Sequence, residues 1–459
     1  MELFRRYVAQ WTPGAISWKK RASTETSRST KPTLISMPQE ILVMIVAELS
    51  GTDVVQLRKT CKLLEELSYN RAAWREIFLN HIHTTLPKPF FLPKPLQECS
   101  SKLIEQSLAN WEAEWAPTIP TTEHVIHASR DPIGKRQLVA TCLLPGGRWL
   151  LAGYRDGSVW YFDLDVKGTI SPALLIESPY PESLASTNKV RLVFSVDLLS
   201  DVAQASPPGS YHLTQFNIAI VASHIRRTVD TVVSVWRVQI ALENDSATGL
   251  RKVELLSTFH EERFEDVWSC DLYGTTLTYL GRTTGGPTSI IIVDWPDAAG
   301  QTDINRVLRR YISSSDSARA FLLPEDRILT VVNYGARESP GEIQLIHWRQ
   351  DCPVTSTSPS QQTHPLPIVG PKKHGLPLIY LASVTSPAVI ADELRFVVPA
   401  RGHLYGLVIP LSFALGPEEE NIRVELLVTG EIKPGQQMRV GYRQMFSMTT
   451  LNEREQARA

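Results

Sequence analysis

The sequence predicts a multidomain protein, in which a small all-α domain and a helical connector precede an all-β region of the β-propeller class. Three observations lead to this fold class. Residues 34–83 contain short helical periods separated by capping residues. A proline-rich stretch and another helical period follow. From residue 138 onward, apolar runs and turn signals repeat as four-strand units, which is the pattern of propeller blades.

Length and composition limit the class of protein. The chain has 459 residues, of which 43% are hydrophobic, and at roughly 100–200 residues per domain this predicts two to four folding units. A formal net charge of −1 gives no bulk field that would attract nucleic acid or anionic membrane, so we expect neither as a partner. No apolar run reaches the roughly 18 residues of a membrane span, and the N-terminus lacks the apolar stretch of a secretory signal.

Cysteine usage indicates the compartment. The five cysteines are an odd number, are widely scattered and form no C-x-x-C motif, which is typical of a reducing environment. We therefore expect a cytoplasmic and/or nuclear protein. Residues 1–33 are interpreted as a disordered basic tail, with Lys19, Lys20 and Arg21 among serines and threonines. The alternative for these lysines and arginine is a nuclear-import or nucleic-acid patch.

The first helix of residues 34–83 is expected to begin after Ser36, an N-cap whose capping box would be completed by Gln39. Ile41, Ile45 and Leu49 then recur every four residues and lie on one helical face. This apolar surface is larger than one short helix can bury.

Two further helices complete the predicted three-helix domain. Gly51 is expected to end the first helix and Asp53 to cap the second, while Asn70 can cap a last helix that directs Trp74 inward. Three short helices in about fifty residues form a domain too small to hide all of its apolar surface.

These residues resemble the F-box family. The stretch "ISMPQEILVMIVAELSGTDVVQLRKTCKLLEELSYNRAAWREIF" contains the family's ordered slots at Met37-Pro38, Glu40-Ile41-Leu42, Ile45, Leu49, Asp53-Val54, Leu57, Cys61-Lys62 and Trp74-Arg75. Met37 and Val54 stand where the family has leucine, and both keep the apolar character.

The resemblance implies a partner for the surplus apolar surface, because F-box domains dock on the Skp adaptor of SCF-type ubiquitin ligases. The residues we expect to bind that adaptor are Met37, Pro38, Ile41, Leu42, Ile45, Leu49, Val54, Leu57 and Trp74. Some of them, Trp74 especially, can instead serve the small domain's own core. An ordinary three-helix core without a partner is the alternative.

Residues 84–117 are predicted to be a connector. "TTLPKPFFLPKP" contains four prolines, which block both helix and central strand. From Leu96 to Trp115 the helical period returns, with one broad apolar face. The members of that face are Leu96, Cys99, Leu103, Leu108, Trp111 and Trp115. We interpret the two tryptophans as packing residues.

Residues 118–459 are predicted to form the propeller. Five units end at Leu164, Val238, Trp295, Trp348 and Leu411, about 53–74 residues apart. Residues 430–450 and a returning strand near 119–128 can supply a sixth unit, so we expect six blades, with five to seven allowed. Residues 352–377, rich in Ser, Thr, Pro and Gln, are expected to be a surface loop.

The units resemble degenerate WD repeats. "VATCLLPGGRWLLAGYRDGSVWYFDLD" has the strand–turn–strand–Asp-Gly–strand order, with Phe162-Asp163 in the place of Trp-Asp. His260 precedes a strand as the family's Gly-His step does, but without the glycine. A mixture of unrelated β domains is the alternative.

The sequence contains no recognisable catalytic constellation. The G-x-G-x-x-G, G-x-x-x-x-G-K-S/T and G-x-S-x-G signatures are absent, so we expect no cofactor. His81 and His83 are interpreted as solvated rather than as metal ligands, and Cys61 is expected on a buried helix face. We therefore expect a protein that is not an enzyme and holds no metal.

The resemblances imply a substrate-recognition subunit of an SCF-type ubiquitin ligase. The F-box would dock on the Skp-type adaptor and through it on a cullin, while the propeller would bind a client protein. Two alternatives stay open. One is a propeller scaffold whose F-box acts outside ubiquitin transfer, and the other is an enzyme whose acids or histidines converge in the propeller's central channel.

Overall fold

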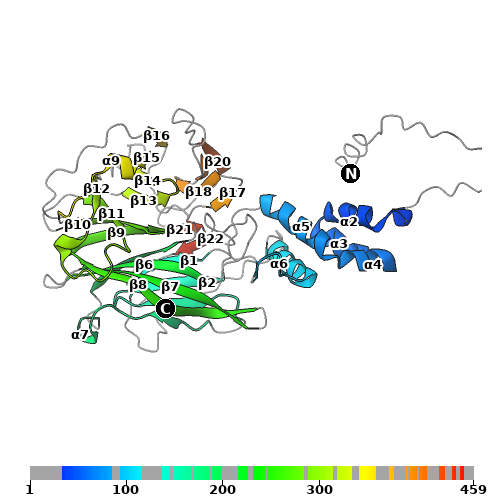
Figure 1. Cartoon of the computed structure of the whole chain (residues 1–459), viewed down its shortest axis with the longest axis horizontal. Coiled ribbons are helices and arrows are strands. Elements are labelled where there is room, and N and C mark those ends of the chain that lie inside the picture. Colours follow the sequence, from blue (N-terminus) through cyan, green and yellow to red (C-terminus); the bar gives the residue numbers. More distant parts are fainter. Residues whose placement is uncertain are drawn as a thin grey trace, which may run out of the picture.

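The computed structural model separates a helical body from a body of β-sheets (Figure 1). It describes residues 34–84, 92, 94–114, 137–144, 148–166, 170–185, 189–197, 215–225, 231–243, 246–283, 288–313, 318–332, 341–357, 372–376, 388–390, 393–400, 403–410, 423–429, 437–440 and 445–448. Residues 1–33, predicted to be a basic tail, and Trp115 therefore lie outside the described residues. None of the helices within these ranges combines the length and the hydrophobicity that crossing a membrane requires.

Short helices fill the F-box-like region, as predicted. The 3₁₀ turn η1 (Leu34–Ser36) leads into helices α2 (Gln39–Ala47), α3 (Gly51–Leu57), α4 (Lys62–Ser68) and α5 (Arg71–Thr84). Four helices therefore stand where three were expected, because the second predicted helix is divided in two. The extended backbone of Cys61 starts α4 anew.

The caps differ in part from the prediction. Pro38 precedes α2 without a side-chain cap, and Ser36 lies in η1 instead. The cap of α3 is Ser50, whose Oγ accepts a hydrogen bond from the Asp53 backbone N–H at 3.1 Å. Asn70 caps α5 as predicted, since its Oδ1 accepts from the Ala72 N–H at 2.8 Å.

The connector helix α6 (Ser101–Glu114) packs on the same core as the helices before it. Ile104 and Leu108 are buried in one cluster with Trp74 and Phe78. Leu96, Cys99 and Leu108 are buried, but the helix expected from Leu96 begins only at Ser101, and the buried Ile104 was missed. The side chain of Trp111 lies outside the described residues. The boundary predicted at residue 84 stays a prediction, although the core cluster crosses it.

Within its described residues, the β region contains five four-stranded antiparallel sheets, each with its strands in sequence order. The first sheet consists of β1 (Leu138–Leu143), β2 (Trp149–Tyr154), β3 (Val159–Asp163) and β4 (Ala173–Ile176). The second consists of β5 (Val190–Asp197), β6 (Gln215–His224), β7 (Thr231–Glu243) and β8 (Ser246–Glu261). The third consists of β9 (Phe264–Tyr273), β10 (Thr276–Thr283), β11 (Thr288–Asp294) and β12 (Arg310–Ser313).

The fourth sheet consists of β13 (Ala318–Leu323), β14 (Arg327–Val332), β15 (Gly341–His347) and β16 (Lys372–Leu376). The fifth consists of β17 (Ala388–Ile390), β18 (Glu393–Ala400), β19 (His403–Pro410) and β20 (Arg423–Thr429). Strands β21 (Gln437–Val440) and β22 (Met445–Met448) form a two-stranded sheet. Short helices lie at α7 (Glu182–Ala185), η3 (Ile304–Arg306) and α9 (Trp348–Asp351).

Consecutive sheets stack face to face, which is the packing of propeller blades. On β6, Ile218 and Ile220 join the core shared with the first sheet, whereas Ala219 and Val221 join the core shared with the third. Further shared cores connect the third sheet to the fourth and the fourth to the fifth. Strands β1, β5, β9 and β13 contact one another in series. The predicted β-propeller class is thereby confirmed.

Two details of the β prediction need correction or stay open. Residues 372–376 were assigned to a loop but form strand β16, because their backbone completes the edge of the fourth sheet. The expected returning strand near 119–128 lies outside the described residues, so the number of blades stays a prediction.

Candidate protein-interaction surfaces

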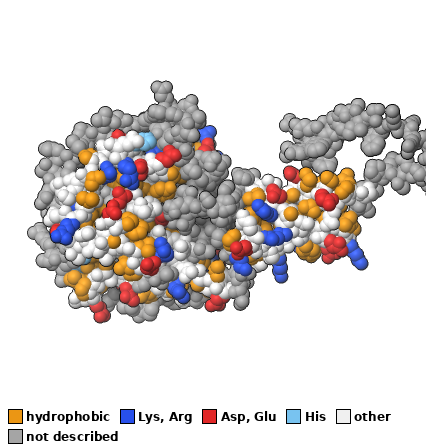
Figure 2. Space-filling model, in the orientation of Figure 1, with side chains coloured by type: hydrophobic (Ala, Val, Ile, Leu, Met, Phe, Trp, Pro, Cys, Tyr) orange, Lys and Arg blue, Asp and Glu red, His pale blue; other side chains and the backbone are white. Residues whose placement is uncertain are grey.

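The predicted adaptor-binding residues fall into groups of different exposure. Met37 and Ile41 are 41% and 43% exposed, and Pro38 is exposed between them in the sequence. Ile45, Leu49 and Leu57 are half-buried. Figure 2 shows hydrophobic side chains exposed over the helical part of the molecule.

The other three predicted residues belong to the core. Leu42, Val54 and Trp74 are 2%, 0% and 1% exposed. The indole Nε1 of Trp74 donates to the backbone oxygen of Ser68 at 2.6 Å, so both its apolar and its polar parts are satisfied within the domain. In this conformation these three side chains support a docking surface rather than form it.

The structure adds two residues that the sequence prediction missed. Leu34 and Met44 are 47% and 63% exposed, and together with Met37 and Ile41 they form the exposed stripe. Ile41 and Met44 are three residues apart on α2 and lie on one face of it, while Leu34 in η1 and Met37 between the two elements are exposed just before that helix. The helical period of α2 could have identified Met44 but not Leu34, and only exposure separates this face of α2 from the buried one.

A charged cluster holds α6 against the ends of α3 and α4. Arg58 forms a bidentate ion pair with Glu105 of α6, at 2.8 and 2.6 Å. Its Nε donates to Ser68 Oγ at 2.9 Å, and its guanidinium lies 4.2 Å from the centre of the Tyr69 ring. The hydrogen bonds with Glu105 raise the pKa of Arg58, so this cluster stays charged.

The cysteines are free thiols among the described residues. Cys61 is exposed at the start of α4, so its expected place on a buried helix face is wrong. An N-cap residue has extended backbone and does not share the buried stripe of the helix that follows it. The side chains of His81 and His83 lie outside the described residues.

The first propeller sheet keeps the Asp-Gly turn that the sequence indicated. Gly157 has a backbone φ of +92°, which residues other than glycine rarely adopt. Asp156 Oδ1 accepts from the Ser158 N–H at 2.9 Å, and Ser158 Oγ accepts from Trp160 Nε1 at 2.9 Å. These bonds fix the hairpin between β2 and β3.

A buried ion pair joins the second and third sheets one residue beyond His260. The carboxylate of Glu261 accepts from Arg309 Nε at 2.8 Å and Nη2 at 2.9 Å, and both side chains are 0% exposed. Tyr279 donates to the same carboxylate at 2.5 Å. Burial raises the pKa of Glu261, while the bonds from Arg309 and Tyr279 act in the opposite direction.

One acid, Asp271, connects the first strands of three sheets. The alternative of an enzyme in the central channel required such acids to converge there. Asp271 on β9 accepts from Ser195 Oγ of β5 at 2.8 Å and from the Leu322 N–H of β13 at 2.7 Å. Both carboxylate oxygens are therefore used to join blades. No three histidine, cysteine or acidic side chains within the described ranges are grouped closely enough to hold a metal ion.

The raised pKa of the half-buried Asp271 leads us to expect that the stability of the propeller depends on pH. Burial, with Asp197 nearby, raises its pKa from 3.8 to about 7. The folded state therefore retains a proton that the unfolded state releases between these values, and stability falls as the pH rises through this window. We expect urea unfolding at pH 5 and pH 8 to show a lower free energy of unfolding at pH 8. Asp271→Asn should flatten this slope, and an unchanged slope would assign it to another group.

Comparison with known proteins identifies the helical region. Residues 34–80 match the F-box-like family. They form an F-box-like domain. The chain is also 30% identical over 166 residues to F-box/WD repeat-containing protein 9 of Homo sapiens, covering 34% of this chain and 33% of that protein. The match thus spans about a third of the relative's length.

Three solved structures are similar to this chain over roughly two thirds of its length. U3-55K is 12% identical with a TM-score of 0.28, covering 64% of this chain and 81% of its own. The Cps50 (Swd1) β-propeller domain of Myceliophteria thermophila is 11% identical with a TM-score of 0.30, covering 63% and 71%. The fission yeast SREBP-SCAP binding domains are 8% identical with a TM-score of 0.26, covering 70% and 80%. The propeller class of this chain accordingly rests on its own sheet order and shared cores.

Proposed function

We propose that this chain is a substrate-recognition subunit of an SCF-type ubiquitin ligase. Its F-box-like domain docks on a Skp-type adaptor, and through it on a cullin, while the propeller binds a client protein. The observation that carries the proposal is the exposed stripe on η1 and α2, since it lies within the residues that match the F-box-like family. A cytoplasmic or nuclear location belongs to the same proposal.

The exposed stripe has the chemistry of a docking surface. Its four members are long, flexible or branched apolar side chains, and each is at least 41% exposed. Covering one such side chain contributes roughly 1.5–3 kcal/mol before the costs of association are deducted. The half-buried Ile45 and Leu49 lie on the same helix or just beyond it and can extend the contact.

The proposed mechanism is proximity. The chain itself makes and breaks no bond, and it raises the effective concentration of a client lysine near a charged conjugating enzyme. The similarity to an F-box/WD repeat-containing protein supports this non-catalytic adaptor role. A scaffold that binds the adaptor without supporting transfer is the competing proposal, and ubiquitin transfer in a complex reconstituted with the cullin distinguishes the two.

The docking surface is tested by a charge placed on the exposed stripe. We expect Ile41→Asp to weaken binding of a purified Skp-type adaptor about hundredfold, because an unpaired carboxylate resists burial. Binding is measured by calorimetry on the full-length chain, with thermal melting as the check on folding. Ile41 is 43% exposed, so the melting temperature should not change.

Leu174→Asp provides the matched control. Leu174 on β4 is 45% exposed and lies in the propeller, so its replacement should leave adaptor affinity unchanged. If Ile41→Asp binds the adaptor as tightly as the wild type, the docking stripe is refuted. If both aspartate variants lose the adaptor equally, the loss does not come from the stripe.

A further inference from the structure

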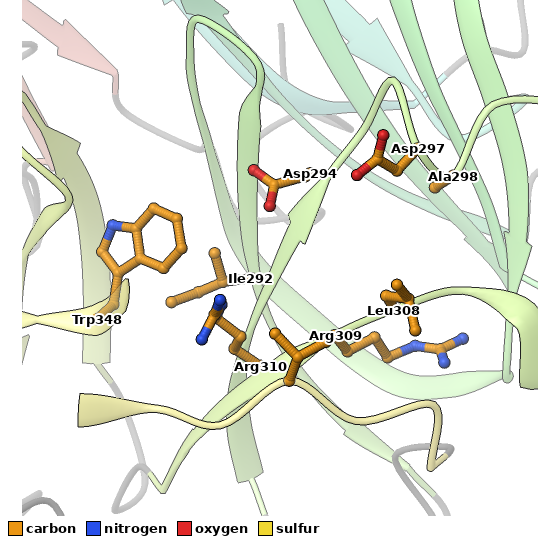
Figure 3. Close-up of a pocket in the computed structure, with 9 residues that line it drawn as sticks. Ile292, Asp294, Asp297, Ala298, Leu308, Arg309, Arg310 and Trp348 are labelled. Carbon is orange, nitrogen blue, oxygen red and sulfur yellow. The ribbon is translucent and has the colours of Figure 1, made fainter. Parts of the chain in front are cut away.

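A cavity of about 140 Å³ lies beside β11 and β12 in the propeller (Figure 3). Its lining includes Trp348, at the start of α9, and Val354, in the segment after α9. That segment is held in place, because Arg309 and Thr355 exchange backbone hydrogen bonds of 2.8 Å. The proposed function uses none of these residues.

Much of the cavity lining is apolar. Ile292, Ala298 and Trp348 are each 2% exposed and form its interior. Leu308 and Val354 are 53% and 49% exposed, so aliphatic surface continues from the cavity to the outside. Such a lining fits an alkyl chain better than a free ion.

Two carboxylates form the polar wall. Asp294 ends β11, and the Asp297 N–H donates to the Asp294 carbonyl at 3.1 Å, which holds both residues in one tight turn. Figure 3 shows their carboxylates on the opposite side of the cavity from Arg309 and Arg310.

The positive groups in the lining are already engaged. The charge of Arg309 is neutralised by the buried carboxylate of Glu261. Arg310 donates to the backbone oxygens of Arg349 and Cys352, which keeps its guanidinium away from the two aspartates.

The carboxylates are less well compensated. Asp294 lies 3.8 Å from Arg349, whose closer partner is Asp326 at 2.8 Å. Asp297 forms no ion pair with a residue of the described part of the chain. Three carboxylates, those of Asp294, Asp297 and Asp326, stand against the guanidinium groups of Arg310 and Arg349. The cavity and its neighbours therefore keep one net negative charge, which favours a cationic ligand.

We propose that this cavity binds the side chain of a lysine or arginine presented by a partner protein. The alkyl stem lies against Leu308 and Val354, and the cationic head reaches Asp294 and Asp297. Two carboxylates alone are too few to hold a metal ion, and the aliphatic rim matches the stem of a long basic side chain. The inference is independent of adaptor docking, because the cavity and the exposed stripe lie in different domains.

Saturation-transfer NMR on the full-length chain tests the proposal with small probes. N-acetyl-lysine methylamide and N-acetyl-arginine methylamide should receive saturation, whereas the norleucine analogue, which keeps the stem without the ammonium group, should receive much less. Asp297→Asn should weaken binding of the lysine probe about tenfold, through loss of a charge-assisted contact.

Asp165→Asn is the matched control, because Asp165 is 52% exposed in the first sheet region and far from the cavity in the sequence. It should bind the lysine probe as the wild type does. Equal saturation of the lysine and norleucine probes would overturn the proposal, as would an unchanged lysine signal in Asp297→Asn. Loss of the signal in Asp165→Asn as well would show that binding is non-specific attraction to surface carboxylates.

Discussion

Replacing Arg309 by methionine is expected to lower the free energy of unfolding of the propeller by about 3–5 kcal/mol. The substitution removes both hydrogen bonds to Glu261 and leaves a carboxylate that is 0% exposed with Tyr279 as its remaining partner. A buried charge without its counter-ion cannot recover its hydration, so the variant loses more than the net contribution of the pair. Urea unfolding followed by tryptophan fluorescence measures the change.

The stability of the Arg309→Met variant should also change with pH in a definite direction. Burial already raises the pKa of Glu261, and loss of the guanidinium removes a group that opposes this shift. The folded variant should therefore bind a proton at Glu261, and its stability should fall as the pH rises through the elevated pKa. Adding Glu261→Gln should recover much of the loss at neutral pH, since the amide can still accept from Tyr279.

Arg306→Met is the matched control for the ion pair. Arg306 lies 3.5 Å from Asp303, but the two side chains are 74% and 51% exposed. Solvent screening limits such a pair to about 0–1 kcal/mol. If Arg309→Met lowers the free energy of unfolding no more than Arg306→Met does, the buried ion pair does not stabilise the contact between the two sheets.

Truncating Trp74 to alanine is expected to destabilise the F-box-like domain by about 3–5 kcal/mol. Trp74 is 1% exposed, packs with Phe78, Val54 and Ile104, and donates a hydrogen bond to Ser68. Its loss leaves a cavity and an unpaired carbonyl in a domain with a small core. Adaptor binding should be lost because the domain unfolds, and not because a contact residue is missing.

Two measurements separate these causes. Differential scanning calorimetry of the full-length chain should show an unchanged propeller transition and a lower transition for the helical domain. Ile41→Ala removes a side chain that is 43% exposed and should leave both transitions in place. A Trp74→Ala chain whose helical transition is unshifted would place this indole outside the core and return it to the docking surface.

Much of this organisation follows from local sequence signals. The F-box-like helices were predicted because apolar residues recur at helical spacing between caps such as Asn70. The sheets were predicted because apolar runs alternate with turn signals such as Asp156-Gly157. Both signals act over a few residues, so they can be recognised without knowing what packs against them.

The errors arose where a non-local contact decides the outcome. Residues 372–376 have an unremarkable loop composition, yet they form a strand because β15 offers an open edge. Cys61 matches an apolar helical position but faces solvent, since a new helix begins there. Neither the edge nor the break is encoded in the spacing of apolar residues.

The division of the candidate docking residues shows the same limit. The sequence by itself determined which side chains of α2 are apolar, and hence that the helix has more apolar surface than one face can bury. Only the tertiary structure decided that Leu42 lies inside while Ile41 and Met44 lie outside. The pairing of Glu261 with Arg309, 48 residues apart, likewise appears only when two sheets stack. Periodicity specifies a face, whereas burial depends on which neighbour covers it, and that neighbour comes from elsewhere in the chain.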